Sequence, residues 1–93
     1  MLIGTLRVDL FLPLSSSLKE KRFALQSLKT KIQNRFNVSI AEVDYQDKWQ
    51  RAGLGAACVS TDRKVIDGML NGVLELIEKD DRVEITDRLI EVL

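Results

Sequence analysis

The residues best suited to chemistry are four cations and one serine, gathered where a helical segment begins. They are Ser17, Lys19, Lys21, Arg22 and Lys29. A helix N-terminus offers free backbone amides and partial positive charge, which attract phosphate, and lysine and arginine neutralise an RNA backbone. Without an anion, each cation at this end is unfavourable by a few tenths to about 1 kcal/mol. We therefore predict an anion- or RNA-binding site.

Two competing roles for these cations stay open. Lys21 or Arg22 could pair with an acid elsewhere in the fold or across a dimer, or the cations could simply be solvated. Arg22 and Lys29 are seven residues apart and share a helical face with Gln26 and Gln33. Such a stripe suits a phosphate backbone, and it equally describes an ordinary solvent-exposed face.

The second cluster lies in a polar stretch between two expected strands and contains the only tryptophan. Its residues are Asp47, Trp49, Gln50 and Arg51. Trp and Arg supply much of the binding energy at protein interfaces, and Arg51 could stack on the indole ring or on a base. The cluster predicts a partner-binding segment. In the competing interpretation, Trp49 covers one end of the core.

Composition excludes several enzyme chemistries. The chain has no histidine, so it lacks the commonest general base and transition-metal ligand. The single cysteine, Cys58, cannot hold an iron–sulfur cluster by itself and is expected in the core. No Gly-rich nucleotide-binding motif occurs. We expect no cofactor and no catalytic residue, and a non-enzymatic role is favoured.

Three acids, Glu42, Asp44 and Asp47, form a weak candidate for a Mg²⁺ or Ca²⁺ site. Alternate residues of a strand share a face, so Glu42 and Asp44 could converge. A solvated strand edge explains these acids as well, and we predict no metal site.

Length and composition indicate one globular domain over residues 1–93. The formal net charge is +0, but residues 1–61 hold nine Lys or Arg against five Asp or Glu, and residues 62–93 hold five against nine. No overall field therefore attracts nucleic acid or membrane. One cysteine, and an N-terminal apolar run interrupted by Arg7 and Asp9, predict a cytoplasmic protein without a signal peptide or membrane span.

Apolar periodicity predicts a strand over residues 2–12 and a helix over residues 17–36. Ser17 and Glu20 have capping-box spacing at the start of this helix. A second strand over residues 38–45 has an unclear phase, which requires either a bulge near Ala41 or an inward-facing Glu42.

The second half of the chain predicts a strand over residues 53–61, a helix capped by Ser60, Thr61 or Asp62, and a strand over residues 83–93. In the helix, Gly68 and Gly72 are one turn apart and suggest close packing against a neighbour. In the last strand, a phase break at residues 87–88 indicates either a bulge or a corner that starts a fifth strand.

The element order is strand, helix, strand, strand, helix, strand. It predicts a ferredoxin-like βαββαβ fold of the α+β class, an antiparallel sheet with two helices on one face. The other face would expose Ile3, Phe11, Leu89 and Leu93. Open apolar faces are unusual on monomers, so we expect a homo-oligomer, most simply a dimer through the sheet.

Five ordered motifs resemble those of the YlxP-like family, small bacterial proteins of a domain-of-unknown-function class. They read SLKEKR (17–22), RFNVS (35–39), AEVD (41–44), DKWQRA (47–52) and LG (54–55). The resemblance covers nearly the whole chain and implies a ferredoxin-like fold, with no established activity and no catalytic residues. Family members are often encoded near translation and ribosome-maturation genes, which implies an RNA or ribosome role by association only. The matching positions are Ser17, Lys19, Lys21, Arg22, Glu42, Asp47, Trp49, Gln50 and Arg51.

The leading functional hypothesis is a non-enzymatic module that binds RNA or the ribosome through its basic first helix. One alternative is a structural or protein-interaction subunit that uses the open sheet face or the tryptophan segment. Another is a binder of small phosphate ligands. Sequence-specific reading of DNA is not expected, nor is membrane binding.

Overall fold

The alternating apolar residues of the first strand build the centre of the sheet. The computed structural model describes residues 1–93, and its sheet has the strand order β2-β3-β1-β4 with every neighbouring pair antiparallel. The elements are β1 (Leu2–Phe11), α1 (Leu18–Arg35), β2 (Ser39–Asp44), β3 (Arg51–Ser60), α2 (Arg63–Glu78) and β4 (Glu84–Val92). This order confirms the ferredoxin-like α+β prediction.

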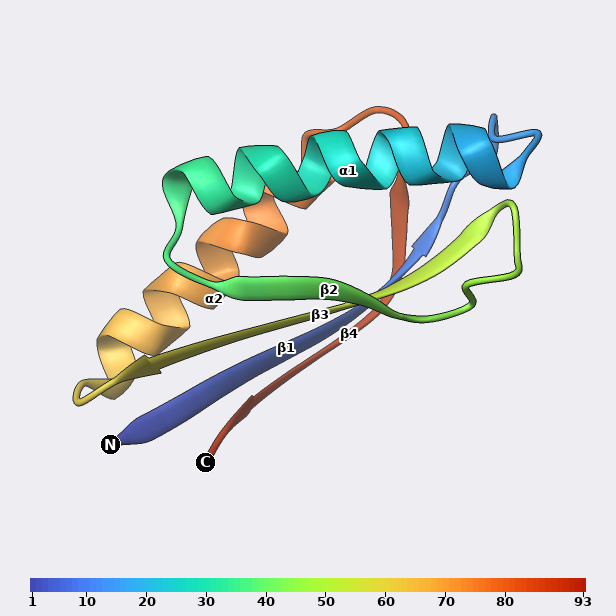
Figure 1. Cartoon of the computed structure of the whole chain (residues 1–93). Helices are drawn as coiled ribbons and strands as arrows, with labels where there is room; N and C mark the ends of the chain where they lie inside the picture. The colour runs from blue at the N-terminus through green and yellow to red at the C-terminus, as the bar shows by residue number, and fades with distance from the viewer.

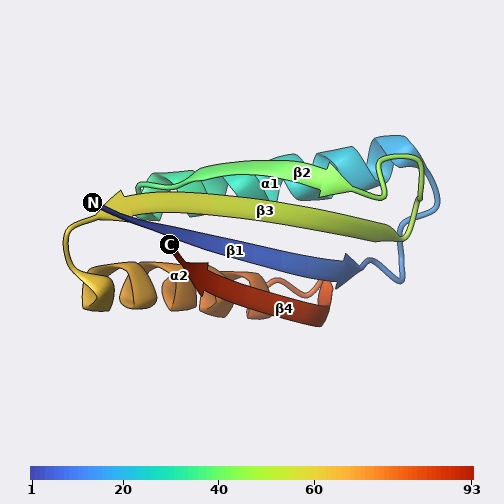
Figure 2. The same ribbon diagram turned by 90° about the horizontal axis from the view of Figure 1, so that it is seen from below.

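Both helices cover the same face of the sheet (Figure 1), and the other face is open (Figure 2). The core between sheet and helices contains 18 buried hydrophobic residues, contributed mainly by both helices and by strands β1 and β3. Cys58 is among them, as predicted, and its burial raises the pKa of the thiol. Neither helix has the length and apolar content that crossing a membrane requires.

Two irregularities explain the phase breaks seen in the sequence. In β2 the register shifts between Glu42 and Asp44, which pair with Leu54 and Gly53 respectively, so Val43 is the extra residue. The side chain of Glu42 consequently faces the helices, and both predicted alternatives for this strand occur together. In β4 the shift lies at Thr86, and the strand continues to Val92 without a corner or a fifth strand.

The two glycines of α2 have different surroundings. A Cβ atom on Gly72 would lie 2.6 Å from the ring of Phe36, so the close packing predicted there is confirmed. A Cβ atom on Gly68 would meet nothing within 4 Å, so the same prediction is wrong for Gly68. Only Gly72, which faces the C-terminal end of α1, must lack a side chain.

This difference gives a matched pair of substitutions. Gly68→Ala should stabilise the protein by about 0.5–1 kcal/mol, because alanine favours the helix and the site is open. Gly72→Ala should destabilise it by about 1–3 kcal/mol, because the Phe36 ring must move. Urea denaturation followed by circular dichroism measures both. Equal effects from the two substitutions would contradict the close contact between Gly72 and Phe36.

Candidate functional site

The N-terminus of α1 is closed by the chain's own side chains. Ser17 is the N-cap, and its hydroxyl accepts a hydrogen bond from the amide of Glu20 at 3.1 Å. The Glu20 carboxylate accepts from the backbone amide of Ser16 at 2.6 Å and from the Ser16 hydroxyl at 2.9 Å. It therefore reaches one residue further back than the N-cap amide of a standard capping box. These bonds, the one from the Ser16 amide first, lower the pKa of the Glu20 carboxyl.

An external anion would have to displace this carboxylate. The Ser17 hydroxyl accepts from the Glu20 amide, so Ser17 is the capping residue of α1. Its own O–H can still donate, so the assignment of Ser17 to an anion site stays a prediction. The same geometry argues against a small phosphate ligand at the start of α1.

Lys21 is completely buried, the only charged side chain in the interior. Its ammonium Nζ lies 2.9 Å from Oε2 of Glu42 and donates to the carbonyl oxygens of Tyr45 at 2.8 Å and Arg51 at 3.2 Å. The carbonyl of Gln46 lies at 3.5 Å. The contact between Glu42 Oε2 and the Lys21 ammonium lacks the geometry of a hydrogen bond, so it is a close ion pair. The inward turn of Glu42 makes this pair possible.

This arrangement corrects the assignment of Lys21 to the anion-binding set. Its charge is balanced by an acid of β2, which is the pairing alternative left open by the sequence. Lone charges are very costly to bury, and a partner with several carbonyl oxygens offsets that cost. Lys21 therefore holds α1 to the connection between β2 and β3 and is not available to a ligand.

The same connection presents the predicted tryptophan cluster. Tyr45 has a left-handed backbone (φ 60°), and the guanidinium of Arg51 lies over its ring, 4.1 Å from the centroid. Gln50 donates through Nε2 to the carbonyl of Pro13 at 3.1 Å, and its own carbonyl accepts from the amide of Leu12 at 2.8 Å. The segment is thus tied to the chain on both sides of Trp49, whose side chain is 57% exposed.

Trp49 therefore does not cover the core, contrary to the competing interpretation of the sequence. It lines an open hollow together with the residues just before α1 and those around it in the connection. These lining residues are Ser15, Ser16, Asp47, Lys48, Trp49, Gln50 and Arg51. The fold thus brings the tryptophan cluster beside the start of α1.

The remaining predicted cations lie along the outer side of α1. Lys19, Arg22 and Lys29 line one groove between α1 and β2, and none of them forms a salt bridge. Phe23 lines the same groove with 74% of its surface exposed. Sequence reasoning missed Phe23. Its position off the apolar stripe of Leu18, Leu25, Leu28 and Ile32 is the signal that could have found it.

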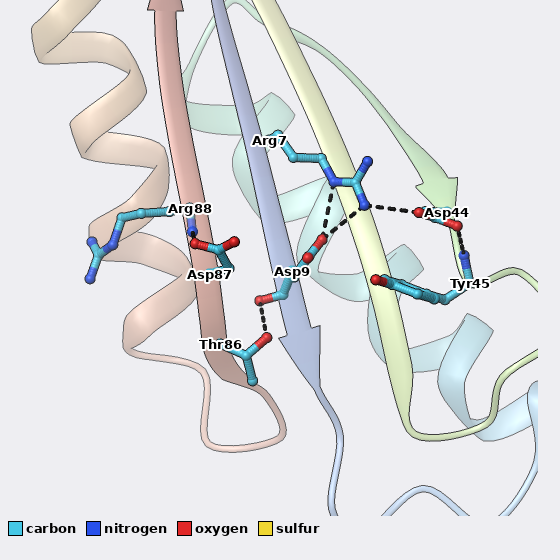
Figure 3. Close-up of polar contacts among 7 residues, drawn as sticks. All are labelled: Arg7, Asp9, Asp44, Tyr45, Thr86, Asp87 and Arg88. Atoms are coloured by element: carbon cyan, nitrogen blue, oxygen red, sulfur yellow. Dashed lines mark hydrogen bonds and ion pairs between the residues drawn. The ribbon is translucent and has the colours of Figure 1, made fainter.

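The open sheet face carries a different polar cluster (Figure 3). Arg7 donates to Asp9 at 3.0 Å through Nε and to Asp44 at 3.1 Å, and Asp44 also accepts from the amide of Tyr45 at 2.8 Å. The Tyr45 amide first, and then Arg7, lowers the pKa of the Asp44 carboxyl. Because the bulge turns Glu42 and Asp44 to opposite faces, they do not converge on a metal ion.

These features define a small ferredoxin-like α+β protein with a basic first helix. The family model described as "Protein of unknown function (DUF503)" matches residues 3–90, and the chain belongs to this family. It is 41% identical over 85 residues to the "Uncharacterized protein YlxP" of Bacillus subtilis (strain 168), covering 91% of this chain and 92% of the relative. The YlxP-like resemblance is thereby confirmed.

A solved structure shares the fold at low sequence identity. The "De novo designed protein Foldit4" superimposes with a TM-score of 0.53 at 12% identity, over 99% of this chain and 94% of the other. At this identity the likeness concerns the fold alone.

The buried ammonium makes a specific prediction about stability. Lys21→Met keeps the length of the side chain but leaves Glu42 without its counter-ion and the carbonyl oxygens without their donor, and should cost about 3–5 kcal/mol. Lys19→Met, on the exposed side of the same helix, should change stability by no more than about 0.5 kcal/mol. Urea unfolding of both variants tests the prediction. A small effect of Lys21→Met would show that the ion pair is not structural.

Asp44 should contribute to acid sensitivity. Its pKa is lower in the folded than in the unfolded protein, so its stabilising contribution is present above the unfolded value, about 3.9, and is lost as the pH falls through the folded value. Asp44→Asn should therefore flatten the fall in Tm below about pH 4. Asp81→Asn, at an exposed carboxylate without a partner, is the control and should leave the slope as it is.

Proposed function

We propose that this protein is a non-enzymatic module that binds RNA through the outer side of α1. The observation that carries the proposal is the exposed ring of Phe23, which lies in one groove with Lys19, Arg22 and Lys29. Cations that neutralise phosphates beside a ring on which a base can stack are the two components of single-stranded RNA recognition.

The charges of α1 favour a polyanionic partner. The helix contains six Lys or Arg and a single acid, Glu20, and that acid is engaged with Ser16. Of the six cations only Lys21 forms an ion pair. Among the cations outside α1, Arg7, Arg82 and Arg88 form salt bridges within the fold, for example Arg82 with Asp80 and Arg88 with Glu78. A row of unneutralised cations on one helix attracts phosphates and releases counterions when they bind.

The exposed aromatic side chains favour unpaired bases over a duplex. Trp49, like Phe23, is more than half exposed, and it lies beside Lys48 and Arg51 at the end of α1 where the helix begins. A single strand that follows the cations of α1 would continue towards this second ring. Trp49 belongs to a connection that the Lys21 ammonium holds in place, so its position is set before RNA arrives.

The sheet face is a poor alternative surface for RNA. Its central strand β3 shows Gly53, Gly55 and Ala57 on the open side, so this strand offers no aromatic ring for stacking. Unpaired segments of structured ribosomal RNA, in the cytoplasm, are our proposed physiological target for α1.

The proposal is tested with a labelled single-stranded RNA of about 12 nucleotides and with purified ribosomal subunits, at several salt concentrations. Lys19→Glu/Arg22→Glu should weaken binding at least about tenfold and reduce the slope of log K against log salt by about 1.4, at about 0.7 for each lost phosphate contact. The matched control, Arg63→Glu/Lys64→Glu, makes the same charge change on α2 and should bind as the original protein does.

Phe23→Ala separates stacking from charge in the same assay. It should cost about 1–3 kcal/mol of binding free energy and leave the salt slope unchanged. Binding that is insensitive to salt, or that both double variants weaken equally, would contradict an RNA site on α1. Failure of the protein to bind either probe would contradict the proposed function itself.

A further inference from the structure

The open face of the sheet is apolar in patches that no element of the chain covers. Val59, Leu89 and Leu93 are 61%, 55% and 71% exposed, and Val43, the bulged residue of β2, is 49% exposed. Both helices lie on the opposite side (Figure 2). Several large apolar side chains exposed together on one side of a small protein usually mark a binding surface.

The middle of this face is hollowed. Ala41, Gly55 and Ala57 lie across strands β2 and β3, and their small size leaves a depression of about 340 Å³. Val43 and Leu89 line its sides. Substitution of Gly55 would narrow the hollow, since a Cβ atom there would lie 3.1 Å from Val43. The depression is wide enough for one bulky aliphatic or aromatic side chain.

The charges around the hollow are mostly negative. Strand β4 places Glu84, Asp87 and Glu91 on the open face, opposite Phe11, Asp9 and Thr5 of β1, and none of these three carboxylates forms a salt bridge. Arg7 is shared between Asp9 and Asp44 (Figure 3) and leaves one further negative charge in excess. Arg51 is the one cation of this face without an acidic partner.

We propose that this face docks a basic segment of another protein, with one bulky apolar side chain in the hollow and lysine or arginine against the carboxylates of β4. Charge complementarity selects this occupant. RNA would meet the unneutralised acids, and a second copy stacked face to face would bring its own three carboxylates to the same interface. The surface is separate from α1, so this inference is independent of the proposed RNA site.

The test uses amide NMR spectra of the full chain, titrated with the capped peptide Lys-Leu-Lys-Leu-Lys. Shift changes should concentrate at Ala41, Gly55, Ala57, Leu89 and Glu91, and should be absent with Glu-Leu-Glu-Leu-Glu. The shift changes should be much smaller with Lys-Ser-Lys-Ser-Lys, because this peptide has no apolar side chain to place in the hollow. Changes confined to α1, or equal changes with the acidic peptide, would overturn the proposal.

Two double variants test whether the carboxylates of β4 bind the peptide. Asp87→Lys/Glu91→Lys should weaken binding of Lys-Leu-Lys-Leu-Lys about fivefold or more, through the loss of two exposed charge pairs. Glu75→Lys/Asp81→Lys makes the same charge change away from the sheet and should leave the affinity as it was. Both variants should retain RNA binding. Equal weakening by the two variants would overturn the site.

Sedimentation of the peptide-free protein tests whether a second copy of the chain occupies the sheet face. A monomer at micromolar concentration supports an outside partner. A dimer that Leu89→Ser dissociates would overturn the proposed occupant and assign the same face to self-association, which the apolar strand positions of the sequence predict.

Discussion

The burial of the Lys21 ammonium is the interaction on which the rest of the structure around the proposed binding surface of α1 depends. The ammonium lies out of contact with solvent and joins α1, the inward-facing Glu42 of β2 and the backbone carbonyls of the β2–β3 connection. A charge in the interior is tolerated only where its partners are arranged around it, so the connection has one favoured position. That position keeps Trp49 outside the core and beside the start of α1.

The bulge in β2 is the backbone feature that allows this arrangement. It turns Glu42 towards the helices and Asp44 towards the open face, two residues later in the same strand. Each acid then meets a different cation, Lys21 inside and Arg7 outside. One extra residue thus separates the interior ion pair from the surface cluster, and it does so where the chain enters the connection that presents Trp49.

The two sides of the molecule have opposite electrostatic character despite a formal net charge of +0. The outer side of α1 presents unneutralised cations with an exposed aromatic ring, and the open sheet face presents unneutralised carboxylates around an apolar hollow. Surfaces of opposite sign attract different partners and repel each other's ligands. The two proposals, taken together, describe a protein that would join an RNA to a basic protein.

The element order, the ferredoxin-like class, the core cysteine, the basic character of α1 and the family could all be predicted from the sequence, because periodicity, capping residues and ordered motifs are local properties. The sequence could not show which cation is buried. Lys19, Lys21 and Arg22 look alike until Glu42, which is twenty-one residues after Lys21, turns inward in the folded chain. The fold also packs Gly72 closely while leaving Gly68 open, and it leaves the side chains of Trp49 and Phe23 exposed. Those outcomes depend on contacts between segments distant in the chain, which local patterns do not encode.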